Sequence, residues 1–315
     1  MRIGSLRVDG VQRYGVVDNH RITLLPASAD VFDVLAAGNP HPASTGHRVP
    51  WDSATELAVP VPVASIRDFI TFEQHTLGSL RAVTGADEIP QDWYDAPAFY
   101  FTNPHAAIGS GTPVPMPPGC EMLDFELEVA VVIGKAGYNL SVDEAFDHVA
   151  GFTILNDWSA RDLQGREMRV GLGPAKGKDT ATTLGPVLVS VDEFVDYEVE
   201  GRFDLAMEVF VNDTRIGGDT LANMAWTFAE LISYASRGTW VRPGDVLGSG
   251  TCGGGCLAEL WGWHGDRQPP PLQIGDTVTM TVEGIGTIHN TVVAGPPLQP
   301  VPPADRKIAR STTRR

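Results

Sequence analysis

The first sixty residues alternate between hydrophobic and polar positions in short runs, which is typical of strands with one buried face. Residues 1–8 and 11–17 flank an Asp-Gly pair, a signal for a two-residue hairpin turn. Residues 22–25 are predicted to form a third strand and residues 29–37 a short helix. In residues 57–63 prolines recur, and each disfavours helix at itself and at the preceding residue. The pattern predicts a small β domain over residues 1–60.

Hydrophobic runs of strand length dominate the rest of the chain. The strongest is residues 123–133, and further strands are predicted at residues 187–190, 205–211, 246–247, 258–261 and 277–282. Helices are predicted at residues 141–148, where Ser141 and Glu144 have capping-box spacing, and at residues 224–236. Because the strands are not regularly interleaved with long helices, we predict a mixed, mostly β fold with its main domain over residues 61–298.

The net charge of the chain limits the classes of molecule that it is expected to bind. The 315-residue chain has 23 Lys and Arg against 39 Asp and Glu, a net charge of -16. An acidic protein repels phosphate backbones and anionic lipid, so we expect no nucleic acid and no membrane as partner. Residues 305–315 carry five of the basic residues and one acidic residue, which leaves a net charge of -20 on the remainder. Residues 299–315 are predicted to be a disordered basic tail, with a contact arm as the alternative.

The small number of cysteines and the lack of an apolar segment of membrane-spanning length indicate the cellular compartment. Cys120, Cys252 and Cys256 are too few for a disulfide framework, and Cys252 and Cys256 lack the second pair that a zinc site would need. No charged-then-apolar leader and no run near the ~20 apolar residues of a membrane span is found. We expect a cytoplasmic protein.

Glu126 and Glu128 lie two residues apart inside the strongest predicted strand. Side chains at this spacing share one face of a strand, while Leu127 points to the other. Neighbouring carboxylates repel unless a cation lies between them or one of them is protonated. All-oxygen ligation favours Mg²⁺, Mn²⁺ or Ca²⁺ over zinc. The alternative is a half-solvated strand whose polar face meets water.

Two further segments carry candidate chemistry. Asp157 follows an apolar run, as a third ligand at a strand end would, and Arg161 is placed to bind a substrate carboxylate with two hydrogen bonds. The alternative is a helix N-cap at Asp157 beside a surface arginine. Asp68 and His75 are seven residues apart, which on a helix places them on one face.

Two glycine-rich stretches fail as nucleotide-binding motifs. Residues 248–253 fit G-x-G-x-x-G, but residues 257–261 have a strand-like pattern, so no helix N-terminus is predicted for a pyrophosphate. Around Gly177 and Lys178, a Walker motif would need glycine where Leu172 stands and Ser or Thr where Asp179 stands.

Taken together, these segments resemble the fumarylacetoacetate hydrolase family. The resemblance covers residues 66–293 and rests on Leu-Asp-Phe-Glu-Leu-Glu at 123–128, Asn-Asp-Trp-Ser-Ala-Arg-Asp at 156–162, Gly-Lys at 177–178 before two threonines, and Gly-Ser-Gly-Thr at 248–251. It implies a fumarylacetoacetate-hydrolase-like β-roll catalytic domain, a small N-terminal SH3-like β domain and a homodimer. It also implies a divalent metal, Mg²⁺ before Ca²⁺ or Mn²⁺, bound by four carboxylates. By motif these are Asp68, Glu126, Glu128 and Asp157.

The resemblance also implies the remaining roles. His75 and Glu259 match the pair that activates water in the hydrolase branch, and Lys178 matches a residue that stabilises the leaving enolate. The positions that bind substrate oxygens are matched by Tyr100, Arg161, Gln164 and Thr251. The implied function is metal-dependent hydrolysis of a C–C bond in an anionic β-diketone or acylpyruvate-type acid.

Two features leave other functions open. Some related enzymes isomerise, decarboxylate or hydrate 2-oxo or 2-hydroxy-dienoate acids. The chain is also shorter than animal fumarylacetoacetate hydrolases, and a glycine-rich loop at 252–258 departs from their pattern, so the substrate need not be fumarylacetoacetate. A catalytically silent metal-binding protein and a nucleic-acid binder that uses the basic tail are the alternatives from other classes.

Overall fold

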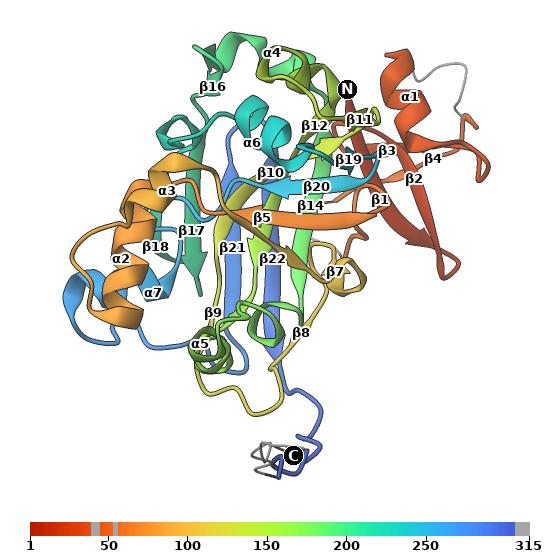
Figure 1. The fold of residues 1–315 in the computed structure, drawn as a ribbon. Coiled ribbons are helices and arrows are strands. Elements are labelled where there is room, and N and C mark those ends of the chain that lie inside the picture. Colours follow the sequence, from red (N-terminus) through yellow and green to blue (C-terminus); the bar gives the residue numbers. More distant parts are fainter. Residues whose placement is uncertain (39–44, 53–55, 306–315) are drawn as a thin grey trace, which may run out of the picture.

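The computed structural model describes residues 1–38, 45–52 and 56–305, and its central feature is a large, mostly antiparallel sheet (Figure 1). The strand order is β4-β3-β2-β1-β14-β12-β10-β20-β5-β6, with β7 paired to β14. The strands are β1 (Arg2–Val8), β2 (Val11–Asp18), β3 (Arg21–Leu24), β4 (Arg48–Pro50), β5 (Ser65–Phe69), β6 (Phe99–Thr102), β7 (Ala107–Ile108), β10 (Leu127–Ile133), β12 (Val149–Asp157), β14 (Thr182–Val189) and β20 (Asp245–Gly248).

A second sheet, in the order β18-β17-β21-β22-β8, packs against one face of the first. Phe152 of the first sheet and Val209 and Met280 of the second belong to one buried cluster. The strands of the second sheet are β8 (Val114–Pro115), β17 (Ala206–Val211), β18 (Thr214–Thr220), β21 (Thr277–Val282) and β22 (Gly286–Val293). Three small ladders pair β9 (Leu123–Asp124) with β13 (Ser159–Ala160), β11 (Gly137–Tyr138) with β19 (Trp240–Val241), and β15 (Glu198–Val199) with β16 (Arg202–Phe203).

The helices lie around the sheets. They are α1 (Val31–Ala37), α2 (Glu73–Thr84), α3 (Gln91–Asp95), α4 (Val142–Ala145), α5 (Arg161–Val170), α6 (Phe228–Ala235) and α7 (Leu257–His264). Short 3₁₀ helices are η2 (Pro104–Ala106), η3 (Phe146–His148), η4 (Lys176–Lys178), η5 (Val191–Tyr197) and η6 (Leu221–Asn223). Figure 1 shows α2, α3 and α7 together at one side of the sheets. The expected mixed, mostly β fold is confirmed.

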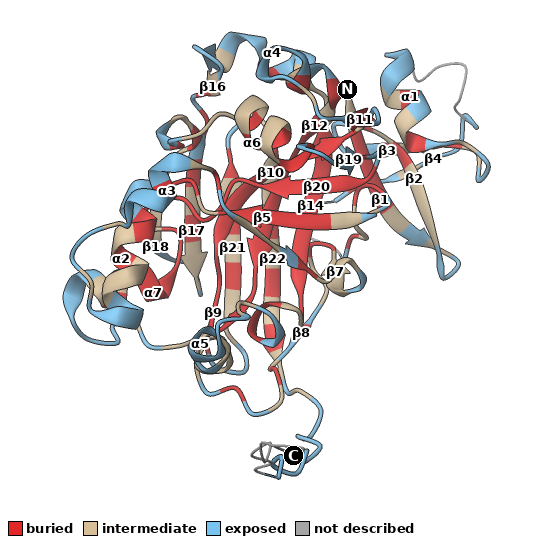
Figure 2. Ribbon diagram, in the orientation of Figure 1, coloured by how far each residue is buried: buried red, intermediate tan, exposed pale blue. Residues whose placement is uncertain are grey.

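Strand β10 is buried on both faces, which explains its uninterrupted apolar run. Val129 and Val131 contact the cluster shared with the second sheet, whereas Ala130 and Val132 belong to a separate cluster on the opposite face. In Figure 2, β5, β14 and β20 are coloured as buried, whereas much of α1 and α4 is coloured as exposed. The apolar run of β10 therefore forms the buried centre of the fold, and the carboxylates of the 123–128 motif are placed at its start.

The N-terminal strands follow the sequence prediction closely but do not stand apart. Asp9 and Gly10 have φ values of 51° and 79°, the positive values that a hairpin of this type requires. The meander β1 to β3 continues through β1 into β14 and so becomes part of the large sheet. A separate SH3-like barrel is not confirmed, and the domain boundary at residue 60 stays a prediction.

Several element predictions need correction. Residues 258–261, predicted as a strand, lie in helix α7, because a short apolar run fits both periods and packing against α2 decides between them. The strand predicted over 123–133 is broken at Phe125 and Glu126 into β9 and β10. The helix predicted at 224–236 begins at Phe228, after a capping box that joins Thr227 to Glu230.

Two further predictions concern the C-terminal end of the chain and the lack of a membrane-spanning segment. Residues 299–305 are exposed and have no helix or strand, while the basic residues of the predicted tail, within 306–315, lie outside the described residues. Within the described part of the chain, the structure contains no helix with the length and apolarity that crossing a membrane requires.

Candidate active site

The four carboxylates predicted as metal ligands come from neighbouring segments of the large sheet. Glu128 lies on β10, Asp68 on β5, and Asp157 ends β12, while Glu126 occupies the break between β9 and β10. Strand β10 pairs with β12 on one side and with β20 on the other, and β20 pairs with β5. Three adjacent ladders therefore bring together side chains that are up to 89 positions apart in the sequence.

The oxygens of this cluster are close together and shielded from water. Asp68, Glu126 and Glu128 each offer an oxygen, and these atoms lie within 4.8 Å of one another. The exposed fractions of Glu126 and Glu128 are 5% and 0%, so the half-solvated alternative is wrong. Oδ1 of Asp68 and Oδ1 of Asp157 are buried without a hydrogen-bond partner. Such oxygens are costly unless a cation pairs with them, so the cluster fits a hard divalent ion with oxygen ligands.

Gly248 is required for this approach of carboxylates. It pairs with Asp68 on one side and with Ala130 on the other. A Cβ atom at this position would lie 2.6 Å from Oδ1 of Asp68 and 2.8 Å from Oε2 of Glu128. The first glycine of the 248–251 motif therefore leaves the space in which the two carboxylates meet.

Two cations and a phenol complete the cluster. Nζ of Lys178 lies 2.5 Å from Glu126 Oε2 and 2.7 Å from Asp157 Oδ2. Arg161 Nη2 lies 2.7 Å from Glu126 Oε1, without a well-aligned hydrogen bond. The hydroxyl of Tyr100 donates to Asp157 and, at 3.2 Å, to Asp68 Oδ2. Asp157 thus accepts hydrogen bonds from side chains, and because α5 begins four residues later, its alternative as a helix N-cap is wrong.

The pKa values of the clustered carboxylates are governed by their burial and by the few positive charges beside them. Burial raises the pKa of Asp157 to about 8, although Lys178 opposes this shift. Burial, followed by the neighbouring carboxylates, raises the pKa of Glu128 well above its usual range. At Glu126 burial also acts upward, but Lys178 and Arg161 outweigh it and lower the pKa. In the metal-free protein Asp157 and Glu128 thus retain protons that a divalent cation would replace.

His75 and Glu259 lie beside this cluster. His75 Nδ1 is 3.5 Å from Glu259 Oε2, and both residues are buried. The same carboxylate accepts hydrogen bonds from Gln74 at 3.0 Å, from Trp263 at 3.1 Å and from the backbone N–H of Gly254 at 2.7 Å. Burial alone would raise the pKa of Glu259, but His75 and the other donors lower it. The ionised carboxylate of Glu259 therefore faces the imidazole of His75 and orients its ring.

His75 and Glu259 can approach each other because α2 and α7 pack closely where each helix has a glycine. A Cβ on Gly262 would lie 1.9 Å from the carbonyl oxygen of Gly78, and a Cβ on Gly78 would lie 2.5 Å from Glu259 Cγ. The expected helical relation between Asp68 and His75 is wrong, since Asp68 is on β5 and His75 is in the first turn of α2. The strand-to-helix transition nevertheless places both at the site.

The remaining predicted residues line the same region. Gln164 accepts a hydrogen bond from Arg161 Nη1 at 3.1 Å, and Thr251 donates to Glu128 at 3.4 Å. Gly177 packs on α5 so closely that a Cβ would lie 2.7 Å from the backbone nitrogen of Gln164. This contact holds η4, and hence Lys178, beside Arg161. All eleven residues predicted from the sequence belong to this one connected region.

Asp124 was missed as a functional residue, although it lies inside the 123–128 motif. Its fully buried carboxylate accepts hydrogen bonds from the N–H groups of Leu257 and Ala258, at 2.9 and 3.0 Å, and from Arg161 Nε at 2.9 Å. It therefore joins the N-terminus of α7 to Arg161. The expectation that no helix follows the 248–253 glycines is wrong, and the N–H groups at the start of that helix are bonded to Asp124.

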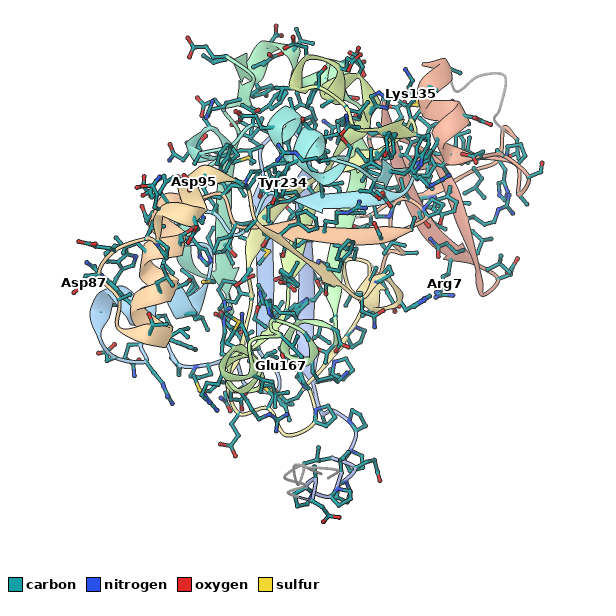
Figure 3. All side chains as sticks on the ribbon, viewed as in Figure 1. Arg7, Asp87, Asp95, Lys135, Glu167 and Tyr234 are labelled. Carbon is teal, nitrogen blue, oxygen red and sulfur yellow. The ribbon has the colours of Figure 1, made fainter. Side chains whose placement is uncertain are left out.

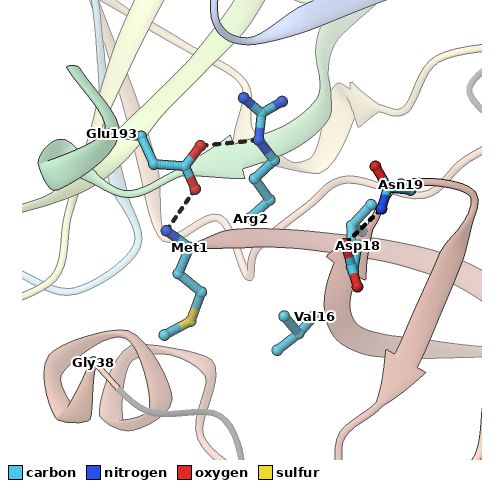
Figure 4. A pocket seen from close by; sticks show the side chains of 8 residues that line it. Met1, Arg2, Val16, Asp18, Asn19, Gly38 and Glu193 are labelled. Atoms are coloured by element: carbon cyan, nitrogen blue, oxygen red, sulfur yellow. Dashed lines mark hydrogen bonds and ion pairs between the residues drawn. The ribbon is translucent and has the colours of Figure 1, made fainter. Parts of the chain in front are cut away.

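The exposed charged side chains and the pocket at the N-terminal strands do not belong to this site. Charged side chains such as Arg7, Asp87, Asp95 and Lys135 are exposed and lie toward the outside in Figure 3, in contrast to the buried cluster. The pocket in Figure 4, about 410 Å³, lies at the N-terminal strands and is lined by Arg2, Asp18 and Glu193 among others. Arg2 and Glu193 form an ion pair there, and none of the predicted site residues lines it.

Comparison with known proteins adds three findings. Residues 66–293 match the family described as "Fumarylacetoacetate (FAA) hydrolase C-terminal". A fumarylacetoacetase of Arabidopsis thaliana is 28% identical over 311 residues, which cover 78% of this chain and 73% of that protein. Oxaloacetate tautomerase YisK of Bacillus subtilis is 36% identical over 170 residues, 54% of this chain and 52% of that protein.

A solved structure supports the same fold. Fumarylpyruvate hydrolase from Pseudomonas aeruginosa, in complex with Mn²⁺ and pyruvate, superposes with a TM-score of 0.59 at 22% identity. The superposition covers 76% of this chain and 92% of that chain.

Proposed function

Because this chain belongs to the fumarylacetoacetate hydrolase family, we propose that it is a metal-dependent hydrolase that cleaves a C–C bond in a β-diketone or acylpyruvate-type acid. The observation that carries the proposal is the buried His75–Glu259 pair next to a buried carboxylate cluster. A hydrolase needs a base for water at this place, whereas a purely structural metal site does not.

The proposed cofactor is a divalent cation, Mg²⁺ before Ca²⁺ or Mn²⁺. Asp68, Glu126, Glu128 and Asp157 are the residues that would hold it. Bound there, it would polarise the substrate's keto oxygens and stabilise negative charge on the departing enolate. The presence of Mn²⁺ in the P. aeruginosa fumarylpyruvate hydrolase supports a divalent metal without deciding which.

The protein's own groups perform the proton transfers and the binding. Glu259 holds Nδ1 of the His75 imidazole, and the other ring nitrogen, Nε2, takes a proton from water. The hydroxide formed adds to the distal carbonyl carbon. The C–C bond then breaks with its electron pair on the departing carbon, and that carbon is reprotonated. The products are a carboxylic acid and a shorter keto acid, so water is consumed and no redox partner is needed.

The surrounding residues position the substrate. The ammonium of Lys178 donates to the oxygen on which the enolate charge develops. The guanidinium of Arg161, together with Gln164, binds the substrate carboxylate. Tyr100 and Thr251 contact the metal-ligand carboxylates from two sides and are proposed to orient the substrate's oxygens.

A second candidate is isomerisation, decarboxylation or hydration of a 2-oxo or 2-hydroxy-dienoate acid on the same scaffold. The 36% identity to an oxaloacetate tautomerase over 54% of the chain favours it as the alternative. Both candidates use the same cations and carboxylates, and they differ in whether water cleaves a C–C bond.

The experiment follows the ultraviolet absorbance of a panel of acylpyruvates and fumarylacetoacetate, with Mg²⁺ and then with chelator, and determines product masses. Chelator-sensitive bleaching with two acid-containing fragments is expected. Bleaching with a single product of unchanged mass or of mass increased by one water, or release of CO₂, would replace hydrolysis by the second candidate. No turnover of any substrate in the presence of bound metal would contradict both.

We further propose a cytoplasmic homodimer whose ligand is a small anionic keto acid. Light scattering of the purified chain tests the dimer, and a mass of one chain would contradict it.

A further inference from the structure

Cys256, His75 and Glu126 form a second group of ligand-type atoms that the proposed reaction does not use as a unit. One ring nitrogen, the thiol sulfur and one carboxylate oxygen lie within 4.8 Å of one another, and all three residues are buried. The sequence showed no second cysteine pair for Cys252 and Cys256. The fold instead brings a histidine from α2 and a glutamate from the β9–β10 break to Cys256.

The spacing of these atoms suits a tetrahedral ion. Sγ of Cys256 lies 3.7 Å from Nδ1 of His75. Zinc bonds to sulfur and nitrogen at tetrahedral angles place the two ligand atoms about 3.5 Å apart. The contact is therefore within a few tenths of an ångström of a zinc geometry, before any movement of the side chains.

The chemistry of the donors separates this group from the neighbouring cluster. Nitrogen, sulfur and carboxylate oxygen are the ligands of Zn²⁺, whereas Asp68 and Glu128 add only oxygens, which hard cations prefer. The two groups share Glu126. Glu126 also contacts Lys178 and Arg161. An ion bound by His75, Cys256 and Glu126 would therefore use a carboxylate that the all-oxygen cluster also needs.

Cys256 is held in place for such a role. It is the N-cap of α7, and its sulfur accepts a hydrogen bond from the backbone N–H of Glu259 at 3.4 Å. Burial raises the pKa of its thiol well above the usual value, so the free thiol is protonated and a bound ion must displace that proton. The N–H group and the N-terminal end of the helix dipole then stabilise the thiolate.

We propose that His75, Cys256 and Glu126 form an inhibitory site for Zn²⁺. An ion bound at Nδ1 of His75 leaves the ring proton on Nε2, so the imidazole no longer accepts a proton from water. It also draws Glu126 away from the all-oxygen cluster. Binding itself does not depend on the reaction, whereas its inhibitory effect rests on the proposed function of His75 as a base. Zinc and the activating hard cation therefore compete.

The binding test uses Co²⁺ as a spectroscopic substitute for Zn²⁺ on the full-length protein. A near-ultraviolet charge-transfer band from thiolate to cobalt is expected, together with the visible bands of a tetrahedral ion, and added Zn²⁺ should abolish both. Cys256→Ser should lose the charge-transfer band, because serine preserves the N-cap but provides no thiolate. Cys252→Ser, which removes another buried thiol in the same loop, is the matched control and should keep it.

Absence of the charge-transfer band in the wild type, or its persistence in Cys256→Ser, would overturn the proposal. Because the spectrum needs no turnover, this failure is distinct from failure of the proposed hydrolase activity. We expect Cys256→Ser to lose more affinity for Zn²⁺ than the roughly 10–100-fold that loss of an outer-shell partner costs.

The inhibition test adds Zn²⁺ to the Mg²⁺-loaded protein and compares each variant with its own zinc-free rate. The wild type and Cys252→Ser should lose activity, and excess Mg²⁺ should restore it. Cys256→Ser should be inhibited only at much higher Zn²⁺ concentration. Equal inhibition of all three proteins would place zinc at the oxygen cluster and overturn the proposed site.

Discussion

At the scale of single residues, the metal cluster depends on the missing side chain at position 248. Alanine there would place Cβ 2.6 Å from Asp68 Oδ1 and 2.8 Å from Glu128 Oε2. We predict that Gly248→Ala lowers Mg²⁺ affinity by roughly 10–100-fold, because the two carboxylates must separate. Isothermal titration of the metal measures this directly.

The matched control is Gly165→Ala in α5. Its Cβ would meet no atom closer than Arg169 Nη1 at 4.0 Å, so metal affinity should not change. An unchanged affinity in Gly248→Ala would show that the cluster tolerates the additional methyl group and that the glycine has another role.

A second residue-scale prediction concerns the proposed base. His75→Gln should bind metal and substrate normally but lower kcat by roughly 100- to 10,000-fold, because glutamine does not accept a proton from water. Steady-state kinetics and metal analysis of the same preparation test it. The comparison variant is His148→Gln, another buried histidine, whose ring contacts the carbonyl of Lys135 outside the site. Near-wild-type kcat in His75→Gln would remove His75 from the mechanism.

At the scale of elements, the crossing of α2 and α7 sets the distance between His75 and Glu259. The Cβ of Gly262→Ala would lie 1.9 Å from a backbone oxygen of α2, so the helices must separate. We expect a loss of about 1–3 kcal/mol in the free energy of unfolding and a larger proportional loss of kcat than of substrate affinity. A stable variant with full kcat would show that the pair tolerates a shift of α7.

Asp124 links two elements, and its replacement should be costly. Asp124→Asn removes one of the two buried carboxylates that face Arg161 and puts an amide next to N–H donors of α7. We predict a loss of about 3–5 kcal/mol in the free energy of unfolding, measured by urea denaturation. Asp143→Asn, at an exposed position of α4, should change it by less than about 0.5 kcal/mol. Equal, small effects of both substitutions would contradict a linking role for Asp124.

At the scale of the whole molecule, the carboxylate cluster couples metal binding, pH and stability. In the metal-free protein, burial raises the pKa of Asp157 to about 8 and raises those of Asp68 and Glu128. The folded state therefore retains protons that the unfolded state releases above about pH 4. Stability from these groups is present below that pH and is lost as the pH rises toward the folded-state values.

We predict that the free energy of unfolding of the chelator-treated protein falls between about pH 5 and pH 8, and that saturating Mg²⁺ largely removes this slope. A metal concentration 100 times Kd should also add about 2.7 kcal/mol. Urea unfolding with and without chelator at each pH measures both effects. Identical pH dependence in the two conditions would contradict a metal site at these carboxylates.

Local patterns predicted much of the fold. Alternation and the Asp-Gly pair identified the hairpin β1–β2, and the apolar run identified β10. Residues 258–261 were assigned to the wrong element because their pattern is compatible with strand and helix alike. The contacts that select the helix come from Asp124 and from α2, both distant in the sequence.

The sequence by itself determined the mostly β composition, the strand that carries Glu128 and, through motif order, the family and all eleven candidate residues. These depend on residue types and spacings that survive in any conformation. Only the tertiary structure decided which atoms meet. The approach of the carboxylates at Gly248, the crossing that joins His75 to Glu259, the linking role of Asp124 and the gathering of Cys256 with His75 all depend on distances between remote segments, which are set by sheet register and helix packing.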